Sequence, residues 1–282
     1  MARLLETEEV LMVPGAFNPL VGLIARKVGF KALYLSGAAF SASLALPDVG
    51  VFTVDELARE VRWLARSTGL PVICDADTGF GEALNVMRAV KELEEAGAGA
   101  IQLEDQVMPK RCGHLENKEV VPAERMAEKV AAAARARKHL LIVARTDARS
   151  ILGMDEAIRR ARLYKQAGAD IIFPEALESE QEFEAFAKAV GGHLLANMTE
   201  FGKTPYLPAQ RFAAIGYKIV IYPVTALRVA AGAVERALSD IMQTGTQKGL
   251  LEGMQTRSAL YQLIDYRGYE SVDRALALDK RK

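Results

Sequence analysis

The sequence predicts an α/β fold in which eight parallel strands close into a TIM (β/α)8 barrel. Short apolar runs rich in β-branched residues recur eight times along the 282 residues. Amphipathic helical patterns separate these runs, and a strict alternation of strand and helix requires a parallel sheet. Polar side chains also gather directly after the runs, at the strand ends where TIM barrels build their active sites.

Each apolar run has the length and composition of a strand that is buried on both faces. The runs are residues 11–14, 32–35, 71–74, 100–103, 140–144, 170–173, 193–196 and 218–222. The helices predicted between them are residues 53–67, 83–96, 122–137, 154–167 and 179–190.

The ends of these helices carry recognisable signals. Thr53 with Glu56, and Ser179 with Glu182, have the spacing of a capping box. Several helices are expected to stop at a glycine, which adopts a left-handed cap most easily. These glycines are Gly29, Gly69, Gly97, Gly168, Gly191 and Gly216.

A doubly wound open sheet is the competing architecture. Such a sheet would carry a glycine-rich phosphate-binding turn after its first strand, and residues 14–19, PGAFNP, lack that pattern. The barrel is therefore favoured, as a single domain over residues 1–282 in which residues 225–282 form a C-terminal helical extension. Helices are expected there at 225–244, 250–264 and 272–278. Their apolar faces need a partner once the barrel is complete.

Composition excludes several classes of partner. Lysine plus arginine and aspartate plus glutamate both total 36, so the net charge is zero, and no basic stripe predicts nucleic-acid binding. The N-terminus lacks the apolar core of a signal peptide, and no apolar run approaches the roughly 20 residues that span a bilayer. The two cysteines do not form a disulfide framework. We therefore expect a cytoplasmic protein with no membrane partner.

Acidic residues at adjacent strand ends predict a metal site. Asp75 and Asp77 are two residues apart, so on a strand they would share one face, and Glu104 follows the next strand. Three carboxylates without clustered histidine suit a hard cation such as Mg²⁺ or Mn²⁺. The alternative is that these acids cap helices or pair with arginines.

The stretch from residue 105 to 121 shows neither strand nor helix periodicity, and we interpret it as a lid or binding loop. It places Lys110, Arg111 and His114 around Cys112, and cationic neighbours favour the thiolate. Gly113 permits a tight turn. We expect these loop residues to take part in catalysis, whereas Cys74 is expected to be a buried hydrophobic residue.

Several motifs together resemble the isocitrate lyase and phosphoenolpyruvate mutase superfamily. They are VICDADTGFG at 72–81, QLEDQ at 102–106, KRCGH at 110–114 and ARTDA at 144–148. The KRCGH loop is similar to that of the carbon–carbon lyases of the superfamily. The segments 196–205, 222–228, 245–248 and 254–257 resemble its methylisocitrate-cleaving branch.

The resemblance implies a Mg²⁺-dependent retro-aldol cleavage of 2-methylisocitrate to pyruvate and succinate, a step of propionate catabolism in the methylcitrate cycle. Asp75 and Asp77 would hold the metal with Glu104. Cys112 would protonate the succinate carbanion, and Tyr34 or a metal-bound carboxylate would be the base. The substrate would be bound by Ser36, Gly37, Ala38, Cys112, Gly113, Arg145, Glu175, Asn197, Met198, Thr199, Arg228 and Arg257. Phe173 and Leu227 are candidates to contact the substrate's extra methyl group.

The resemblance also implies a homotetramer, a dimer of dimers in which a C-terminal helix is exchanged between subunits. Other activities of the superfamily remain open at this point. They are the cleavage of another 2-alkylmalate or of dimethylmalate, the cleavage of isocitrate, and the decarboxylation of oxaloacetate. A degenerate barrel that only senses a dicarboxylate is the alternative outside enzymology, but the intact acid cluster and KRCGH loop argue against it.

Overall fold

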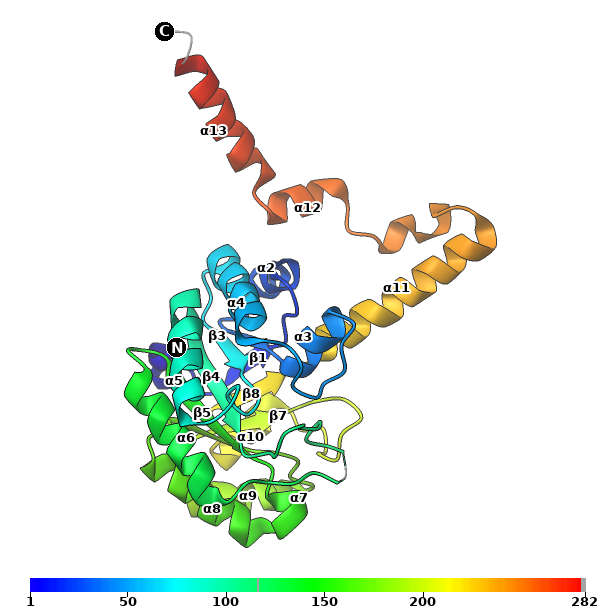
Figure 1. Ribbon diagram of the computed structural model, residues 1–282. Coiled ribbons are helices and arrows are strands. Elements are labelled where there is room, and N and C mark those ends of the chain that lie inside the picture. The colour runs from blue at the N-terminus through cyan, green and yellow to red at the C-terminus, as the bar shows by residue number, and fades with distance from the viewer. Residues whose placement is uncertain (116, 280–282) are drawn as a thin grey trace. The chain divides into compact units, whose positions relative to one another are not determined.

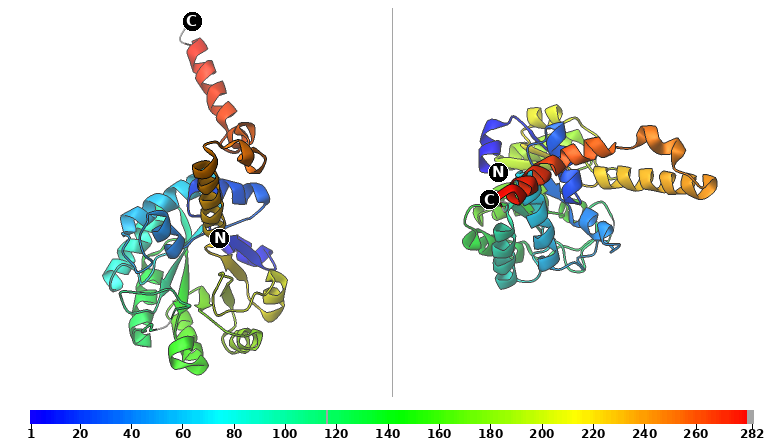
Figure 2. Two further views of the ribbon diagram at one scale, coloured as in Figure 1. Left: turned by 90° about the vertical axis from the view of Figure 1, so that its right-hand side faces the viewer. Right: turned by 90° about the horizontal axis from the view of Figure 1, so that it is seen from above.

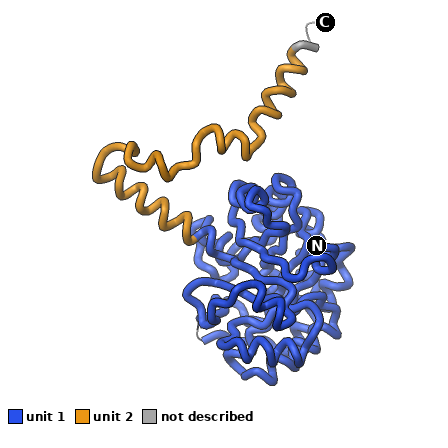
Figure 3. The backbone as a smooth tube through the Cα atoms, turned by 180° about the vertical axis from the view of Figure 1, so that it is seen from behind, with its two compact units in different colours: residues 1–227 blue, residues 228–282 orange. Residues whose placement is uncertain are grey.

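A computed structural model describes residues 1–115 and 117–279. The chain separates into two compact units, Met1–Leu227 and Arg228–Lys282, each of which is described by itself (Figure 3). This boundary lies close to residue 225, where the C-terminal extension was expected to begin.

The first unit is built on an eight-stranded parallel sheet, as predicted (Figure 1). Its spatial order is β1-β8-β7-β6-β5-β4-β3-β2, so only β1 and β2 lie at the ends of the order. The strands are β1 (Leu11–Pro14), β2 (Leu33–Leu35), β3 (Val72–Asp75), β4 (Ala98–Glu104), β5 (Leu141–Thr146), β6 (Ile171–Pro174), β7 (His193–Asn197) and β8 (Ile219–Tyr222).

A short seam brings β1 and β2 together and nearly closes the barrel. Gly15 forms an isolated parallel bridge with Tyr34, and the Ala16 N–H donates to the Tyr34 carbonyl at 2.9 Å. A Cβ on Gly15 would lie 2.0 Å from the Pro223 carbonyl oxygen. Glycine is therefore required where the end of β1 passes the end of β8.

Helices surround the strands of this unit (Figure 2). They are α1 (Ala2–Thr7), α2 (Pro19–Val28), α3 (Gly37–Ser43), α4 (Val54–Thr68), α5 (Ala83–Ala96), α6 (Ala123–Ala136), α7 (Arg149–Leu152), α8 (Met154–Gln166), α9 (Glu180–Val190) and α10 (Ala209–Ile215). All five helices that were predicted between the strands are present. None of the described helices has the length and apolarity needed to cross a membrane.

The predicted caps are confirmed in part. The Thr53 side chain accepts from the Glu56 N–H, and the Glu56 carboxylate accepts from the Thr53 N–H, which completes a capping box. At α9 the Ser179 hydroxyl accepts from the Glu182 N–H, but the Glu182 carboxylate binds the Glu178 N–H instead of returning to Ser179. Left-handed glycine caps occur at Gly29, Gly69, Gly97 and Gly216. Gly168 also has a positive φ, of 110°, directly after the C-cap residue Ala167 of α8. Gly191 differs, because it ends α9 with an extended ψ of −178°.

Apolar side chains fill two layers. Residues inside the barrel, including Val13, Ile73 and Val143, form one buried cluster. Residues between the strands and the helices form the second, larger cluster. Cys74 belongs to this outer layer and has no exposed surface, which confirms its prediction as a core residue. Burial raises the pKa of its thiol.

The loop from 105 to 121 is more ordered at its base than the sequence suggested. Gln106 and Val120 form an antiparallel bridge, the Val107 N–H donates to the Glu119 carbonyl, and the Val121 N–H donates to the Asp105 carbonyl, both at 2.9 Å. The prediction of a run without secondary structure was therefore wrong at both ends of the loop. This short ladder fixes where the loop leaves and rejoins the barrel.

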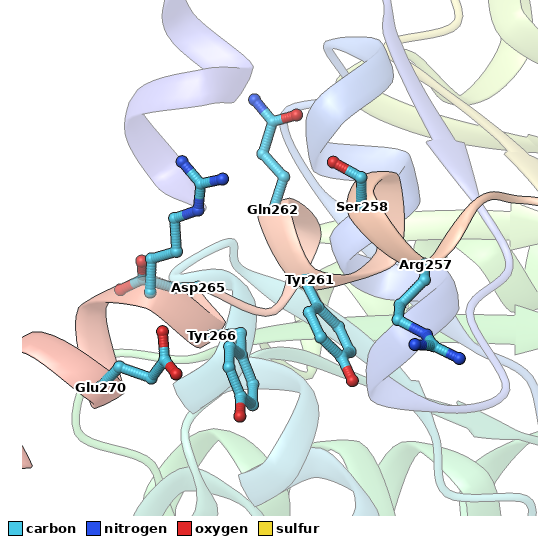
Figure 4. Close-up of a pocket in the computed structure, with 8 residues that line it drawn as sticks. Arg257, Ser258, Tyr261, Gln262, Asp265, Tyr266 and Glu270 are labelled. Carbon is cyan, nitrogen blue, oxygen red and sulfur yellow. The ribbon is translucent and has the colours of Figure 1, made fainter.

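Helix α11 (Thr225–Thr244) begins in the first unit and continues from Arg228 in the second. The second unit also contains a 3-10 helix η1 (Lys248–Gly253), α12 (Arg257–Leu263) and α13 (Tyr266–Asp279). The helix predicted at 250–264 was wrong in its continuity, because Met254 has an extended backbone and α12 begins anew with Thr256 as its N-cap. Tyr261 and Tyr266 stack with ring centroids 4.4 Å apart and line an open pocket (Figure 4).

Candidate active site

The carboxyl ends of the strands bring the predicted polar residues together. Asp75 ends β3 and Glu104 ends β4, Arg145 lies near the end of β5, Glu175 follows β6, and Asn197 ends β7. Because all eight strands are parallel, these ends open at one mouth of the barrel. The mouth is therefore the candidate active site.

Three acids meet at this mouth as predicted, but Asp77 reaches it by a different route. Asp75, Asp77 and Glu104 each offer a carboxylate oxygen, and these oxygens lie within 4.8 Å of one another. The strand ends at Asp75, and Asp77 lies in a turn with a left-handed φ of 47°. The Glu104 N–H donates to the Asp77 carbonyl at 2.9 Å, which holds that turn against β4. The prediction that Asp75 and Asp77 meet because they share one face of a strand was therefore wrong, since Asp77 lies beyond the end of β3.

The three acids differ in how they are held. Asp75 accepts hydrogen bonds from the Gly37 N–H (3.1 Å), the Gln102 amide (2.9 Å) and the Asp77 N–H (3.2 Å). By contrast, Asp77 Oδ2 and Glu104 Oε1 are buried and receive no hydrogen bond from the described residues. The other oxygen of each acid lies in an ion pair, Asp77 Oδ1 with Lys110 and Glu104 Oε2 with Arg145. Asp75 is thus oriented by hydrogen bonds, whereas Asp77 and Glu104 each keep one oxygen available at the mouth.

Burial and mutual repulsion disfavour negative charge on this cluster. Burial raises the pKa of Asp77 to about 7, with Asp75 adding to the rise while Lys110 opposes it. Burial also raises the pKa of Glu104 well above its usual value, and Arg145 and Lys110 only partly oppose this. A carboxylate in such a place needs additional positive charge to stay ionised.

Lys110 carries part of that charge into the mouth. Its ammonium group is buried, lies 2.9 Å from an Asp77 oxygen and also forms an ion pair with Asp48. Burial alone would lower the pKa of Lys110, but Glu104, Asp77, Asp75 and Asp48 outweigh it and raise the pKa well above its usual value. Lys110 therefore remains a cation.

Arg145 is the barrel's own cation at the mouth. Its guanidinium donates to both oxygens of Asp147, at 2.9 and 3.0 Å, and lies 3.1 Å from Glu104 and 3.5 Å from Glu175. The group also lies over the ring of Phe173, 5.4 Å from its centroid. Phe173 thus forms the apolar floor beneath Arg145, with only 1% of its surface exposed.

His114 fastens the loop to two other segments. Its Nε2 lies 2.8 Å from a Glu175 oxygen, and its Nδ1 accepts the Lys203 N–H at 3.1 Å. Because Nδ1 accepts this hydrogen bond, Nε2 is the ring nitrogen that faces Glu175 as a donor. His114 is therefore a connecting residue in this arrangement.

The environment of Cys112 corrects one prediction. Burial raises the pKa of its thiol, Glu175 adds to the rise, and the His114 N–H and Arg145 oppose it. Lys110 is committed to Asp48 and Asp77, and the Arg111 side chain is exposed. The expectation that neighbouring cations favour the thiolate was therefore wrong, since cations adjacent in sequence point elsewhere in space. Cys112 is a protonated, half-buried thiol, which is the form that donates a proton.

Gly113 lies directly against the rim of the barrel. A Cβ on this residue would lie 2.4 Å from an Arg145 nitrogen and 2.4 Å from the Glu175 Cγ. The backbone beside Cys112 therefore approaches these two side chains as closely as only glycine allows.

Tyr34 is unsuited to the role of base. Its hydroxyl lies inside the barrel and donates to the Gln102 amide oxygen at 2.5 Å. Burial and the negative charge of Asp75 raise its pKa well above the usual value. A phenolate is thus disfavoured, and a carboxylate of the acid cluster is the better candidate.

The remaining predicted residues have mixed outcomes. Ser36 is the N-cap of α3. The Gly37 N–H already donates to Asp75, so this N–H is not available to a substrate. Asn197 contacts Glu175 at 3.3 Å. Met198 packs in the outer core and donates its N–H to the Ile221 carbonyl, so its contact with the substrate remains a prediction.

Some predicted residues stay without a structural outcome. Ala38 is half-buried in α3, and Thr199 is half-buried after β7. Arg228 opens the second unit and Arg257 opens α12, so their roles remain predictions.

Sequence reasoning missed three residues of this site. Asp48 lies in a Pro-Asp-Val-Gly turn that looks like an ordinary loop, and Lys118 lies in the loop without periodicity. Gln102 bridges Tyr34 and Asp75 from the middle of β4. A polar residue inside an otherwise apolar strand is a signal that would have found Gln102.

The acid cluster fits a divalent metal ion. Asp77 Oδ2 and Glu104 Oε1 are buried oxygens without a hydrogen bond among the described residues, and hard oxygen ligands suit Mg²⁺ or Mn²⁺. Six carboxyl groups gather here, from Asp48, Asp75, Asp77, Glu104, Asp147 and Glu175, against the cations of Lys110, Lys118 and Arg145. If all six carboxyl groups are ionised, a divalent cation would offset two of the three excess negative charges.

Comparison with known proteins agrees with this geometry. Residues 1–242 match the family described as phosphoenolpyruvate phosphomutase. A 2-methylisocitrate lyase of Aeropyrum pernix is 55% identical over 273 residues, which cover 97% of this chain and 89% of that protein. The structure of a 2,3-dimethylmalate lyase aligns with a TM-score of 0.91 at 32% identity, over 97% of this chain and 93% of that one. A phosphonopyruvate hydrolase in complex with oxalate and Mg²⁺ aligns with a TM-score of 0.87 at 32% identity, over 96% of this chain and 95% of that one.

We predict that the protein binds one Mg²⁺ or Mn²⁺ ion through the acid cluster. Asp77→Asn should weaken binding by about 100-fold or more, because it removes the negative charge of one of the proposed ligands. Isothermal titration calorimetry measures this directly, and Asp155→Asn on the exposed face of α8 is a control with the same change of charge. Equal affinity in Asp77→Asn and wild type would contradict the metal site.

Proposed function

The chain belongs to the phosphoenolpyruvate phosphomutase family, within the isocitrate lyase/phosphoenolpyruvate mutase superfamily, and from this premise we propose that it cleaves 2-methylisocitrate to pyruvate and succinate. The observation that carries the proposal is the placement of the Cys112 loop over Arg145 and Glu175, beside the acid cluster. The named relative at 55% identity supports the same substrate. The proposed reaction places the enzyme in propionate catabolism through the methylcitrate cycle, and a cytoplasmic location would suit it.

The substrate carries three carboxylates and a tertiary hydroxyl, so its binding requires cationic donors. Arg145 offers a planar guanidinium at the rim of the barrel, and arginine suits carboxylates because its donors match both oxygens. Arg228 and Arg257 are proposed to complete this recognition, together with Ser36, Asn197 and Thr199. Mg²⁺ is the proposed metal, held by Asp75, Asp77 and Glu104, and it would supply positive charge toward the substrate's hydroxyl and carboxylate oxygens.

The cleavage is a retro-aldol reaction. A base takes the proton of the tertiary hydroxyl, and the bond between the hydroxyl-bearing carbon and its neighbour breaks as the carbonyl of pyruvate forms. The electron pair of that bond moves onto the succinate fragment, which becomes a carbanion conjugated with its carboxylate. We assign the base to a carboxylate of the acid cluster, since Tyr34 is committed to Gln102.

Cys112 is the proposed acid that completes the reaction. Its thiol is protonated because burial raises its pKa, and it lies within the electrostatic influence of Arg145 and Glu175. Delivery of the thiol proton to the carbanion gives succinate, and the thiolate then recovers a proton from solvent. Cleavage of 2,3-dimethylmalate is the second candidate, supported by the structural likeness to such a lyase.

We also propose a homotetramer in which C-terminal helices are exchanged between subunits. The second unit exposes Val229, Val234, Leu238, Met242, Leu251, Tyr269, Val272 and Leu276, and apolar faces of this extent favour a protein partner. Sedimentation velocity should give a tetramer for the full chain. Leu238→Glu with Val234→Glu should shift the protein to smaller species, and a wild-type monomer at micromolar concentration would contradict the assembly.

We predict that Cys112 is the thiol on which turnover depends. Cys112→Ser should fold normally and lower kcat by about 10²- to 10⁴-fold, because a hydroxyl is a far weaker acid than a thiol. Cys74→Ala is the matched control, and it should mainly cost stability, about 1 kcal/mol, because Cys74 is a core residue. Pyruvate release, followed with lactate dehydrogenase, measures the rates. A Cys112→Ser enzyme as fast as wild type would disprove the assignment.

We predict that kcat/KM favours 2-methylisocitrate over isocitrate by roughly 10- to 200-fold, which is the range for one methyl group in a fitted apolar pocket. The two substrates share every charged group, so only the contact to the methyl distinguishes them. Phe173 and Leu227 are the candidate contacts, and Phe173 already forms the floor beneath Arg145. Parallel assays with 2,3-dimethylmalate and oxaloacetate test the alternatives, and equal constants for the first two substrates would overturn the preference.

A further inference from the structure

Lys118 is a buried loop residue with two acceptors. Only 2% of its side chain is exposed, and its ammonium group donates to the Gly113 carbonyl and to the Asp147 carboxylate, the latter at 2.9 Å. Gly113 directly follows Cys112 in the chain, and Asp147 belongs to the barrel just after β5. One side chain therefore ties the backbone beside the thiol to the barrel.

Asp147 is a firm anchor for this tie. Both of its oxygens accept from Arg145, and its N–H donates to Asp105 at 2.9 Å. Asp105 in turn accepts from Arg160 at 3.0 Å and from Tyr164 at 2.8 Å, both on α8. The point to which Lys118 attaches the loop is thus fixed by β4, β5 and α8 together.

The other end of the tie has little freedom. The backbone at Gly113 lies so close to Arg145 and Glu175 that no Cβ would fit. A small displacement of the Gly113 carbonyl would therefore move the neighbouring Cys112 thiol relative to the rim. A buried ammonium is costly to desolvate unless it is fully paired, so a lysine is a poor choice for filling space alone.

We propose that Lys118 is a positioning residue, which holds the Cys112 loop against the barrel through Gly113 and Asp147 and so sets the place of the thiol. Its effect on turnover rests on the proposed function, because it acts through Cys112. Its effect on the loop does not, because the tie joins groups of the protein itself.

The test measures the reactivity of Cys112 without substrate. Iodoacetamide alkylation is followed by peptide mapping, which separates Cys112 from Cys74, and is repeated across pH so that the rate constant of the thiolate is separated from its pKa. Lys118→Met keeps the volume of the side chain and removes every donor. Its thiolate rate constant at Cys112 should rise about ten- to a hundredfold, because the loop opens more often.

Two further variants make the test specific. Lys118→Arg keeps the donors and should stay much closer to wild type than Lys118→Met. Lys129→Met is the matched control, since Lys129 as a whole residue is as buried as Lys118 and donates to a loop carbonyl, that of Thr78, at 3.0 Å. It should leave alkylation of Cys112 unchanged. Thermal unfolding of Lys118→Met and Lys129→Met is measured as well. A general loss of folding stability would lower the unfolding temperature of both variants, whereas faster alkylation of Cys112 is expected only in Lys118→Met.

The outcomes separate the two proposals. A faster Cys112 in Lys118→Met, with a lower kcat and a KM within a few-fold of wild type, supports the positioning role. Unchanged alkylation in Lys118→Met overturns it, even if the wild-type enzyme cleaves 2-methylisocitrate. A wild type that cleaves no 2-methylisocitrate refutes the proposed function, while the alkylation result still decides the role of Lys118. If Lys118→Met does not fold, Lys118→Gln takes its place, with the same criteria.

Discussion

Repulsion among buried carboxylates is the constraint that shapes the mouth of this barrel. The strands supply acids at the ends of β3 and β4 and after β5 and β6. Among the described strand residues, Arg145 is the cation that forms ion pairs with these acids. The loop from 105 to 121 supplies Lys110 to Asp77 and Lys118 to Asp147. The need for charge balance therefore couples the loop to the barrel. The ion pairs that stabilise the buried carboxylates also position the loop that carries Cys112.

The fold followed from sequence because burial on both faces leaves a clear pattern. Every predicted strand overlaps the observed one, and β4 and β5 extend further toward their carboxyl ends, to Glu104 and Thr146, because polar residues there still pair in the ladder. α1, α3 and α7 were missed, since six, seven and four residues are too few to show a helical period. The break before α12 was missed because apolar spacing continues across residues whose backbone is extended.

The site was predictable as far as local spacing carries information. The acids, the loop and the rim arginine could be identified because each lies at a strand end or within a dense motif. Their partners could not, since Asp48 meets Lys110, and Lys118 meets Asp147, across stretches of chain with no sequence signal. The protonation state of Cys112 was misjudged for the same reason. Proximity in the sequence says little about which way loop side chains point.

The raised pKa of Cys112 has a consequence for the life of the protein in the cell. Peroxide attacks thiolates, so cysteines that depend on a low pKa are readily oxidised to sulfenic acid and need a reductant to recover. At Cys112 the raised pKa favours the protonated thiol, which oxidants attack more slowly than a thiolate. We therefore expect Cys112 to be oxidised more slowly than a cysteine whose pKa is lowered.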